Sequence, residues 1–169
     1  RVLRAAIAED RAAGLQPACI IASAGTVNTG AIDDLPALAA LAAQEDLWLH
    51  VDGCIGALIK LAPRNGALVA GLEMADSLAL DPHKWLHAPF DVGCCLIRDA
   101  ALHRSALASL PEYLDQAPRG LASAEWLFEL DLQLSRSFRA LKLWMALKEQ
   151  CAAKFGRLID QNIDQAAYL

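Results

Sequence analysis

A chain of 169 residues with a hydrophobic fraction of 56% is long enough to bury one sizeable core. Its net charge of −5 is spread along the sequence, and no apolar run approaches the roughly 18 residues of a membrane span, which excludes a basic nucleic-acid-binding stripe and a transmembrane helix. The five cysteines form no Cys-x-x-Cys pair and no signal peptide is visible, so we expect a cytoplasmic protein with reduced thiols.

The first part of the chain alternates helices and strands. Residues 1–13 predict the end of an amphipathic helix, closed by a glycine. Residues 18–23 and 47–52 are short apolar runs, which are typical of buried parallel strands. Between them, residues 33–45 predict a helix with an aspartate cap and a proline in its first turn. A strand, a helix and a strand of these lengths form a right-handed βαβ unit, so we expect a parallel sheet.

The second part continues the sheet and then becomes helical. After a bend and a short helix, residues 77–80 and 92–97 predict a third and a fourth strand. Residues 109–124 contain two prolines and one glycine and have the composition of a mobile surface loop. Residues 124–169 follow a helical pattern, with a break expected near Gly156. The chain is therefore expected to be an α/β protein with helices on the faces of its sheet.

Chemically useful side chains follow several of the predicted strands. Thr26 comes after the first strand, Asp52 ends the second, and Asp81, His83 and Lys84 come after the third. In α/β sheets, ligands bind outside the carboxyl ends of the strands. We therefore expect the topology to bring these residues to one edge of the sheet.

Lys84 is the first candidate for catalysis. It lies in the segment 81–85, which reads Asp-Pro-His-Lys-Trp and separates two apolar strands. A lysine in such a place is expected to be partly desolvated, which lowers its pKa and makes the neutral amine available as a nucleophile.

Asp52 is the second candidate, because it closes the apolar run 47–51. An unpaired carboxylate is costly to bury, so Asp52 is expected to need a cationic partner. A protonated pyridine nitrogen would serve, and the carboxylate would hold it protonated. Such a ring can accept electrons from the α-carbon of a substrate, which is the chemistry of pyridoxal 5'-phosphate (PLP).

At this point the sequence resembles a known family. The His-Val-Asp segment 50–52 and the later Pro-His-Lys-Trp segment 82–85 resemble the group II PLP-dependent amino-acid decarboxylases, which include the aromatic-amino-acid and glutamate decarboxylases. The similarity extends over nearly the whole chain, through segments 24–33, 75–77, 90–94 and 135–144.

The resemblance implies a fold and an assembly. The fold is that of the PLP-dependent transferases of fold type I, the aspartate-aminotransferase-like fold, with a mainly parallel sheet in its large domain. Residues 1–123 correspond to part of the PLP-binding large domain, and residues 124–169 to a helical segment that leads into a truncated C-terminal small domain. The family also implies a homodimer. The chain resembles the central piece of such an enzyme, because the family's Ser-rich phosphate loop and ring-stacking histidine precede the matched part.

The resemblance also implies a role for each candidate residue. Lys84 would form the internal Schiff base with PLP, and Asp52 would pair with the pyridinium nitrogen. Thr26 would hydrogen-bond near the cofactor ring or its phenolic oxygen, and His83 would help to shape the pocket. Tyr113 falls where the aromatic decarboxylases have a mobile-loop tyrosine that protonates the carbanion left by loss of carbon dioxide; its alternative is an ordinary anchor of the loop.

Two positions depart from the family pattern. The small residues after the aspartate are Gly53 and Cys54, which places a thiol where a methyl group is usual. Asp81 stands in the place of a phosphate-binding asparagine, and its negative charge would repel a phosphate. We therefore expect the Asp81 side chain to point away from the site.

The function expected from these residues is PLP-dependent decarboxylation of an L-amino acid to the amine and carbon dioxide. The same Asp and Lys would also serve aldehyde-forming decarboxylation or transamination, and a fragment without its phosphate loop could be inactive. A separate alternative is a metal-dependent hydrolase that uses His50, Asp52, Asp81 and His83 as ligands.

Overall fold

The computed structural model describes residues 2–107, 119–120, 123 and 126–169. The chain divides into two compact units, one of residues 1–96 with 139–169 and one of residues 97–138. Tyr113, one of the predicted site residues, lies outside the described residues. Within the described part of the chain, no helix combines the length and the apolar character that crossing a bilayer requires.

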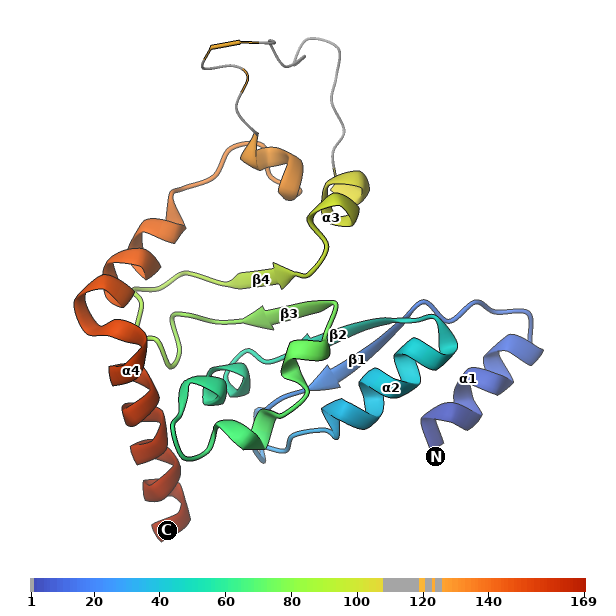
Figure 1. Cartoon of the computed structure of the whole chain (residues 1–169), viewed down its shortest axis with the longest axis horizontal. Helices are drawn as coiled ribbons and strands as arrows, with labels where there is room; N and C mark the ends of the chain where they lie inside the picture. Colours follow the sequence, from blue (N-terminus) through green and yellow to red (C-terminus); the bar gives the residue numbers. More distant parts are fainter. Residues whose placement is uncertain (1, 108–118, 121–122, 124–125) are drawn as a thin grey trace. The chain divides into compact units, whose positions relative to one another are not determined.

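The first unit is built on a sheet with the strand order β1-β2-β3-β4. β1 (Cys19–Ser23), β2 (Trp48–Asp52) and β3 (Ser77–Leu80) are parallel neighbours. β4 (Cys94–Ile97) lies next to β3 and runs in the opposite direction (Figure 1). The mainly parallel sheet expected from the sequence is present, with one antiparallel edge strand of the kind that many α/β sheets carry.

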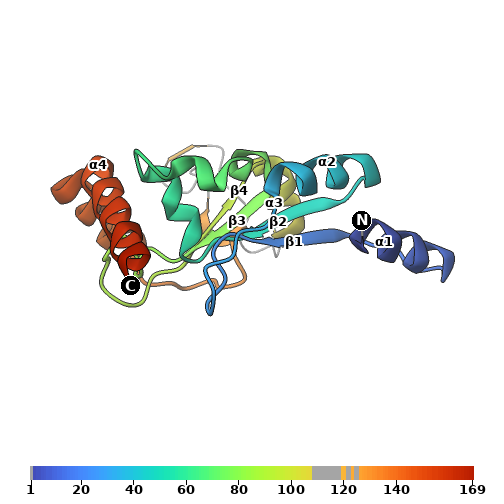
Figure 2. The ribbon, with the colours of Figure 1, turned by 90° about the horizontal axis from the view of Figure 1, so that it is seen from below.

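One face of the sheet carries the core of this unit. Figure 2 shows α2 (Leu35–Glu45) and the short helices after β2 on the same side of the strands. Because side chains alternate between the two faces of a strand, every second residue packs against these helices. The buried apolar residues of β1 and β2 are Ile20, Ala22, Leu49 and Val51. α1 (Val2–Ala12) adds Ile7 to the same core, whereas Ile21, on the other face, is 71% exposed.

Local signals set the ends of α2. The Asp34 carboxylate accepts a hydrogen bond of 3.1 Å from the backbone N–H of Ala37, and Pro36 occupies the first turn, as the sequence predicts. Asp46 ends the helix in the left-handed conformation, with φ 53°. These caps fix where the chain turns into β2.

Three short 3₁₀ helices connect β2 to β3, where the sequence predicted a single short helix. They are η1 (Gly56–Leu61), η2 (Gly66–Val69) and η3 (Leu72–Met74). The long C-terminal helix α4 (Arg139–Tyr168) packs against η1.

α4 differs from the sequence prediction at two points. It begins at Arg139 instead of near residue 124, and it breaks at Cys151, whose φ of 55° and ψ of 155° are not helical, instead of near Gly156. Gly156 lies inside the helix, and a Cβ atom there would come within 2.0 Å of the carbonyl oxygen of Leu61. The glycine therefore permits a close approach of two backbones and does not mark a break.

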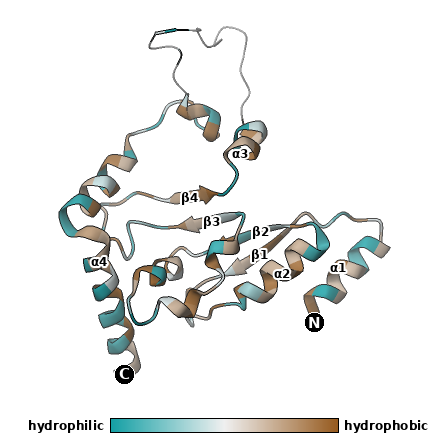
Figure 3. Cartoon of the chain, viewed as in Figure 1, coloured by the Kyte–Doolittle hydropathy of each residue, from teal (hydrophilic) through white to brown (hydrophobic). Residues whose placement is uncertain are grey.

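A buried carboxylate joins α4 to the loop after η1. Asp160 accepts hydrogen bonds from the backbone N–H groups of Arg64 and Asn65, at 3.1 and 3.2 Å, and from the Asn65 side chain at 2.7 Å. Burial of Asp160 opposes its ionisation, but these donors outweigh it and lower its pKa. Figure 3 shows that the last turns of α4 are largely hydrophilic, and the buried residues of the helix are Phe155, Gly156, Ile159 and Asp160.

The second unit contains α3 (Ala100–Leu107) and the 3₁₀ helix η6 (Leu127–Leu130). Asp99 caps α3 by accepting hydrogen bonds from two backbone N–H groups of the first turn. The buried Glu129 pairs with Arg104 at 3.2 Å and ties the two elements together. The domain division at residue 123 stays a prediction.

Candidate active site

Predicted site residues gather at the carboxyl edge of the parallel strands. Asp52 closes β2 and aligns in register with Ser23 of β1 and Ala79 of β3. Thr26 lies in the loop after β1, and Lys84 lies in the turn after β3. Since the three strands are parallel, the segments that follow them leave the sheet at the same edge.

The turn that carries Lys84 is fixed by its backbone. The N–H of Lys84 donates to the carbonyl of Asp81 at 2.9 Å, and the N–H of Asp81 donates to the carbonyl of Cys54 at 3.1 Å. Pro82, between them, is fully buried. The lysine is therefore anchored to the loop that follows Asp52.

The Lys84 side chain has an unexpected partner. Its Nζ lies 2.8 Å from Oδ2 of Asp81, with the two side chains 35% and 24% exposed. The hydrogen bond to Asp81 raises the pKa of Lys84; burial opposes this, and the charges of Asp81 and Asp52 add to it. The expectation of a lowered lysine pKa was wrong, because the ion pair outweighs a desolvation that is only partial. The expectation that Asp81 points away was also wrong.

Asp52 is exposed at the end of β2 and is not buried as the sequence suggested. Its Oδ1 accepts a hydrogen bond of 3.2 Å from the backbone N–H of Cys54. Hydrogen bonds from the thiol and the N–H of Cys54 lower the pKa of Asp52, burial opposes them, and the charge of Lys84 acts in the same direction as the hydrogen bonds. Asp52 therefore stays ionised without a buried cation, and its carboxylate can still pair with one.

The hydrogen bond between Cys54 and Asp52 also changes the pKa of the Cys54 thiol. The hydrogen bond to Asp52, burial and the nearby carboxylate charges raise the pKa of Cys54 to about 11. The thiol is therefore protonated at neutral pH and acts as a hydrogen-bond donor to Asp52 instead of as a nucleophile.

Thr26 is held by its own loop. Its hydroxyl lies 2.8 Å from the hydroxyl of Thr29 and accepts a hydrogen bond of 3.0 Å from the N–H of Ala31. Gly25, with φ 87°, packs against Gly56, where a Cβ atom would lie 2.1 Å from the carbonyl oxygen of Ala24. Only glycine allows the loops after β1 and β2 to touch in this way, and the contact places Thr26 beside the Asp52 loop.

His83 connects the Lys84 turn to the segment that leads into β4. Its Nδ1 lies 2.7 Å from the carbonyl oxygen of Val92 and 3.3 Å from the N–H of the same residue. The imidazole also meets the ring of Phe90 edge-on, with the centroids 5.1 Å apart. This placement suits a residue that shapes the site, and the role of His83 stays a prediction.

A hydrogen-bond centre at Ser77 was missed by the sequence analysis. The Ser77 hydroxyl lies 2.7 Å from Nε1 of Trp48 and 2.7 Å from Nδ1 of His50. His50 is paired with Ser77 in register across β2 and β3, so only the strand alignment could have revealed the contact.

The metal-hydrolase alternative finds no support in the described residues. No group of three or more His, Cys, Asp or Glu side chains among them is arranged to hold a metal ion. The Nδ1 atoms of His50 and His83 are instead engaged with Ser77 and with the Val92 backbone.

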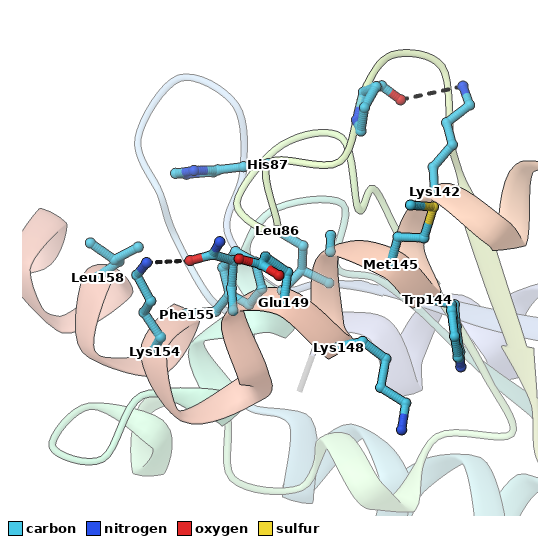
Figure 4. Close-up of a pocket in the computed structure, with 13 residues that line it drawn as sticks. Leu86, His87, Lys142, Trp144, Met145, Lys148, Glu149, Lys154, Phe155 and Leu158 are labelled. Carbon is cyan, nitrogen blue, oxygen red and sulfur yellow. Dashed lines mark hydrogen bonds between the residues drawn. The ribbon is translucent and has the colours of Figure 1, made fainter.

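A cavity of about 850 Å³ lies between the loop after Lys84 and α4 (Figure 4). Asp52, Lys84 and Thr26 do not line it. Its walls are formed by Leu86, His87, Pro89, Lys142, Trp144, Met145, Phe155 and Leu158, among others. None of the three candidate side chains therefore opens into the cavity.

Comparison with protein families identifies the family to which this arrangement of residues belongs. Residues 1–169 match the model described as the pyridoxal-dependent decarboxylase conserved domain. The chain belongs to this family. It is 44% identical over 161 residues to the aromatic-L-amino-acid decarboxylase of Bacillus atrophaeus, which covers 95% of this chain and 34% of the relative. It is 37% identical over 166 residues to the 3,4-dihydroxyphenylacetaldehyde synthase of Aedes aegypti, which covers 98% of this chain and 32% of that protein.

The chain spans about a third of the length of the curated relatives that it matches. A crystal structure of Oryza sativa TDC with PLP and tryptamine superposes with a TM-score of 0.82 at 32% identity, over 91% of this chain and 31% of that one. The family, the fold type I architecture and the PLP cofactor of the pyridoxal-dependent decarboxylases, all expected from the sequence, are therefore confirmed.

The described residues fit PLP. Lys84 supplies a primary amine for the aldehyde of the cofactor, and Asp52 supplies an ionised carboxylate for a protonated ring nitrogen. Lys84 and Asp52 lie close enough for each to shift the pKa of the other. An amine and a carboxylate after neighbouring strands are the donor set that this cofactor requires.

Asp52→Asn should make Cys54 more reactive. The substitution removes the carboxylate that holds the thiol protonated, so the pKa of Cys54 should fall from about 11. Thiolate is the reactive form, and its fraction below the pKa rises about tenfold for each unit that the pKa falls. Alkylation by iodoacetamide at mildly alkaline pH, followed by peptide mass spectrometry, should show faster labelling of Cys54.

Cys95 is the internal control for this experiment. Burial alone raises its pKa, so its labelling rate should not change. An unchanged rate at Cys54 would show that the contact with Asp52 does not control the thiol.

Proposed function

We propose that the protein is a PLP-dependent carboxy-lyase that converts an aromatic L-amino acid into its amine and carbon dioxide. The observation that carries this proposal is the placement of Asp52 and Lys84 at the carboxyl edge, after the neighbouring parallel strands β2 and β3. The 44% identity with the aromatic-L-amino-acid decarboxylase of Bacillus atrophaeus supports the class of substrate.

Lys84 and Asp52 have complementary tasks. Lys84 would hold the cofactor covalently through Nζ, once the ammonium has lost its proton. Bound PLP supplies a cationic conjugated ring that accepts the electron pair left when carbon dioxide departs. Asp52 keeps a proton on the ring nitrogen through its negative charge, and each pKa unit of this effect is worth about 1.4 kcal/mol. The hydrogen bonds from Cys54 keep Asp52 ionised for that task.

Thr26 and His83 complete the proposed site. Thr26 hydrogen-bonds near the ring or its phenolic oxygen, from the loop that packs against the Asp52 loop through Gly25 and Gly56. His83 holds the Lys84 turn in place through its contact with Val92. The proposal also includes a homodimer in the cytoplasm, which the resemblance to the family supports.

Tyr113 is proposed to deliver a proton to the α-carbon of the substrate after carbon dioxide has left. A phenol in a loop that closes over the site can act as a general acid and exclude water. Aldehyde-forming decarboxylation is the second candidate function, because the Aedes aegypti relative at 37% identity is a 3,4-dihydroxyphenylacetaldehyde synthase. The fate of the α-carbon decides between the two.

The full-length protein with PLP should release carbon dioxide from aromatic L-amino acids in a panel that also includes acidic and basic ones. Asp52→Asn should lower turnover about ten- to thousandfold, since an opposite charge shifts a neighbouring pKa by about one to three units. Asp164→Asn, which changes a surface carboxylate on α4, is the matched control and should be neutral. Near-normal turnover of Asp52→Asn, or no carbon dioxide from any amino acid, would refute the proposal.

Tyr113→Phe should change the product and not the loss of carbon dioxide. Without the phenol, the electron-rich α-carbon persists and is oxidised by oxygen, so aldehyde and ammonia should replace most of the amine. Chromatography of the products, together with oxygen consumption, measures this shift. The other tyrosine of the chain, Tyr168, is 91% exposed, and Tyr168→Phe is the control. An unchanged amine yield would assign Tyr113 to anchoring of the loop.

A further inference from the structure

The ion pair between Asp81 and Lys84 is held by a rigid turn. The backbone bonds from Lys84 to Asp81 and from Asp81 to Cys54 fix both partners, and the buried Pro82 lies between them. On the other side, a Cβ atom at Gly93 would lie 3.5 Å from Oδ1 of Asp81, so the segment before β4 lies against the carboxylate. The 2.8 Å contact between Nζ and Oδ2 therefore follows from the shape of the turn.

The charges around Lys84 all favour its ammonium form. Asp81 faces it from the same turn and Asp52 from the end of β2. Burial favours the neutral amine and is outweighed. A lysine must be neutral to attack an aldehyde, so this arrangement opposes the first step of cofactor attachment.

We propose that Asp81 is the resting counter-ion of Lys84, which holds the lysine as an ammonium in the cofactor-free protein and sets the rate at which it captures the cofactor aldehyde. The inference rests on the proposed function of Lys84. In the capture step the ammonium loses a proton to solvent and leaves Asp81. The Nζ lone pair then bonds to the aldehyde carbon, and the two remaining N–H protons leave with the carbonyl oxygen as water when the C=N bond forms.

Pyridoxal, which lacks the phosphate, is the probe that isolates this effect. Visible absorbance would follow its condensation with the full-length, cofactor-free protein across the neutral and alkaline range. Asp81→Asn should speed capture about two- to fivefold near neutral pH, the size expected for a partly exposed ion pair. The difference should vanish above the pKa of the lysine, where the amine is neutral in both proteins.

Glu73→Gln is the matched control, because it removes a comparable carboxylate, 2.9 Å from Lys60, without touching Lys84. Its rate of capture should equal that of the wild type. Equal rates for Asp81→Asn and the wild type would overturn the role of Asp81. A gain with PLP but none with pyridoxal would overturn it too, because Asp81 would then act by repelling the phosphate.

A titration of the wild-type protein provides a second test that needs no variant to fold. Nuclear magnetic resonance of labelled lysines should give Lys84 a pKa above the roughly 10.4 of an unperturbed lysine, and an equal or lower value would refute the inference. Failure of the wild type to bond pyridoxal at Lys84 would contradict the proposed function itself. Bonding at Lys84 with no effect of Asp81→Asn would contradict only the role of Asp81.

Discussion

The parallel alignment of β1, β2 and β3 is the constraint on which the rest of the structure depends. Backbone hydrogen bonds set Ser23, Asp52 and Ala79 at the same level, so the segments after the three strands leave the sheet at one edge. The buried face of the strands packs against α2 and the 3₁₀ helices, which prevents a slip in this register. Residues that are distant in the sequence are thereby gathered into one site.

Two carboxylates share this edge, and each has a local partner. Asp52 is hydrogen-bonded by Cys54, and Asp81 is paired with Lys84. These partners limit the cost of holding several charges together in a partly buried place. The two arrangements differ in what they leave available, since Asp52 keeps free lone pairs for a cation, whereas Lys84 must leave Asp81 before it can react.

The parts of the structure that depend on local patterns could be predicted from the sequence. Apolar runs marked the strands, and Asp34 with Pro36 marked the start of α2. The start of α4 was missed because a helical pattern continues through residues 126–138, where the structure contains only the short η6. Gly156 was misread because its reason is a contact with Leu61, which is far away in the sequence.

The placement of the site could be predicted, but its electrostatics could not. Strand order alone put Asp52 and Lys84 at one edge. The raised pKa of Lys84 depends on the turn that brings Asp81 to 2.8 Å, and the exposure of Asp52 depends on how the loop with Cys54 folds back. Neither the ion pair of Lys84 nor the exposure of Asp52 follows from the apolar character of the flanking strands, which had suggested that both side chains are desolvated.

The central claim is that Lys84, at the edge defined by these strands, bonds to the cofactor. Borohydride reduction of the full-length protein loaded with PLP, followed by peptide mass mapping, tests it most directly, because reduction makes the bond permanent. We expect the pyridoxyl group on Lys84 and on no other lysine. A label on Lys60 or Lys142 in its place would contradict the account.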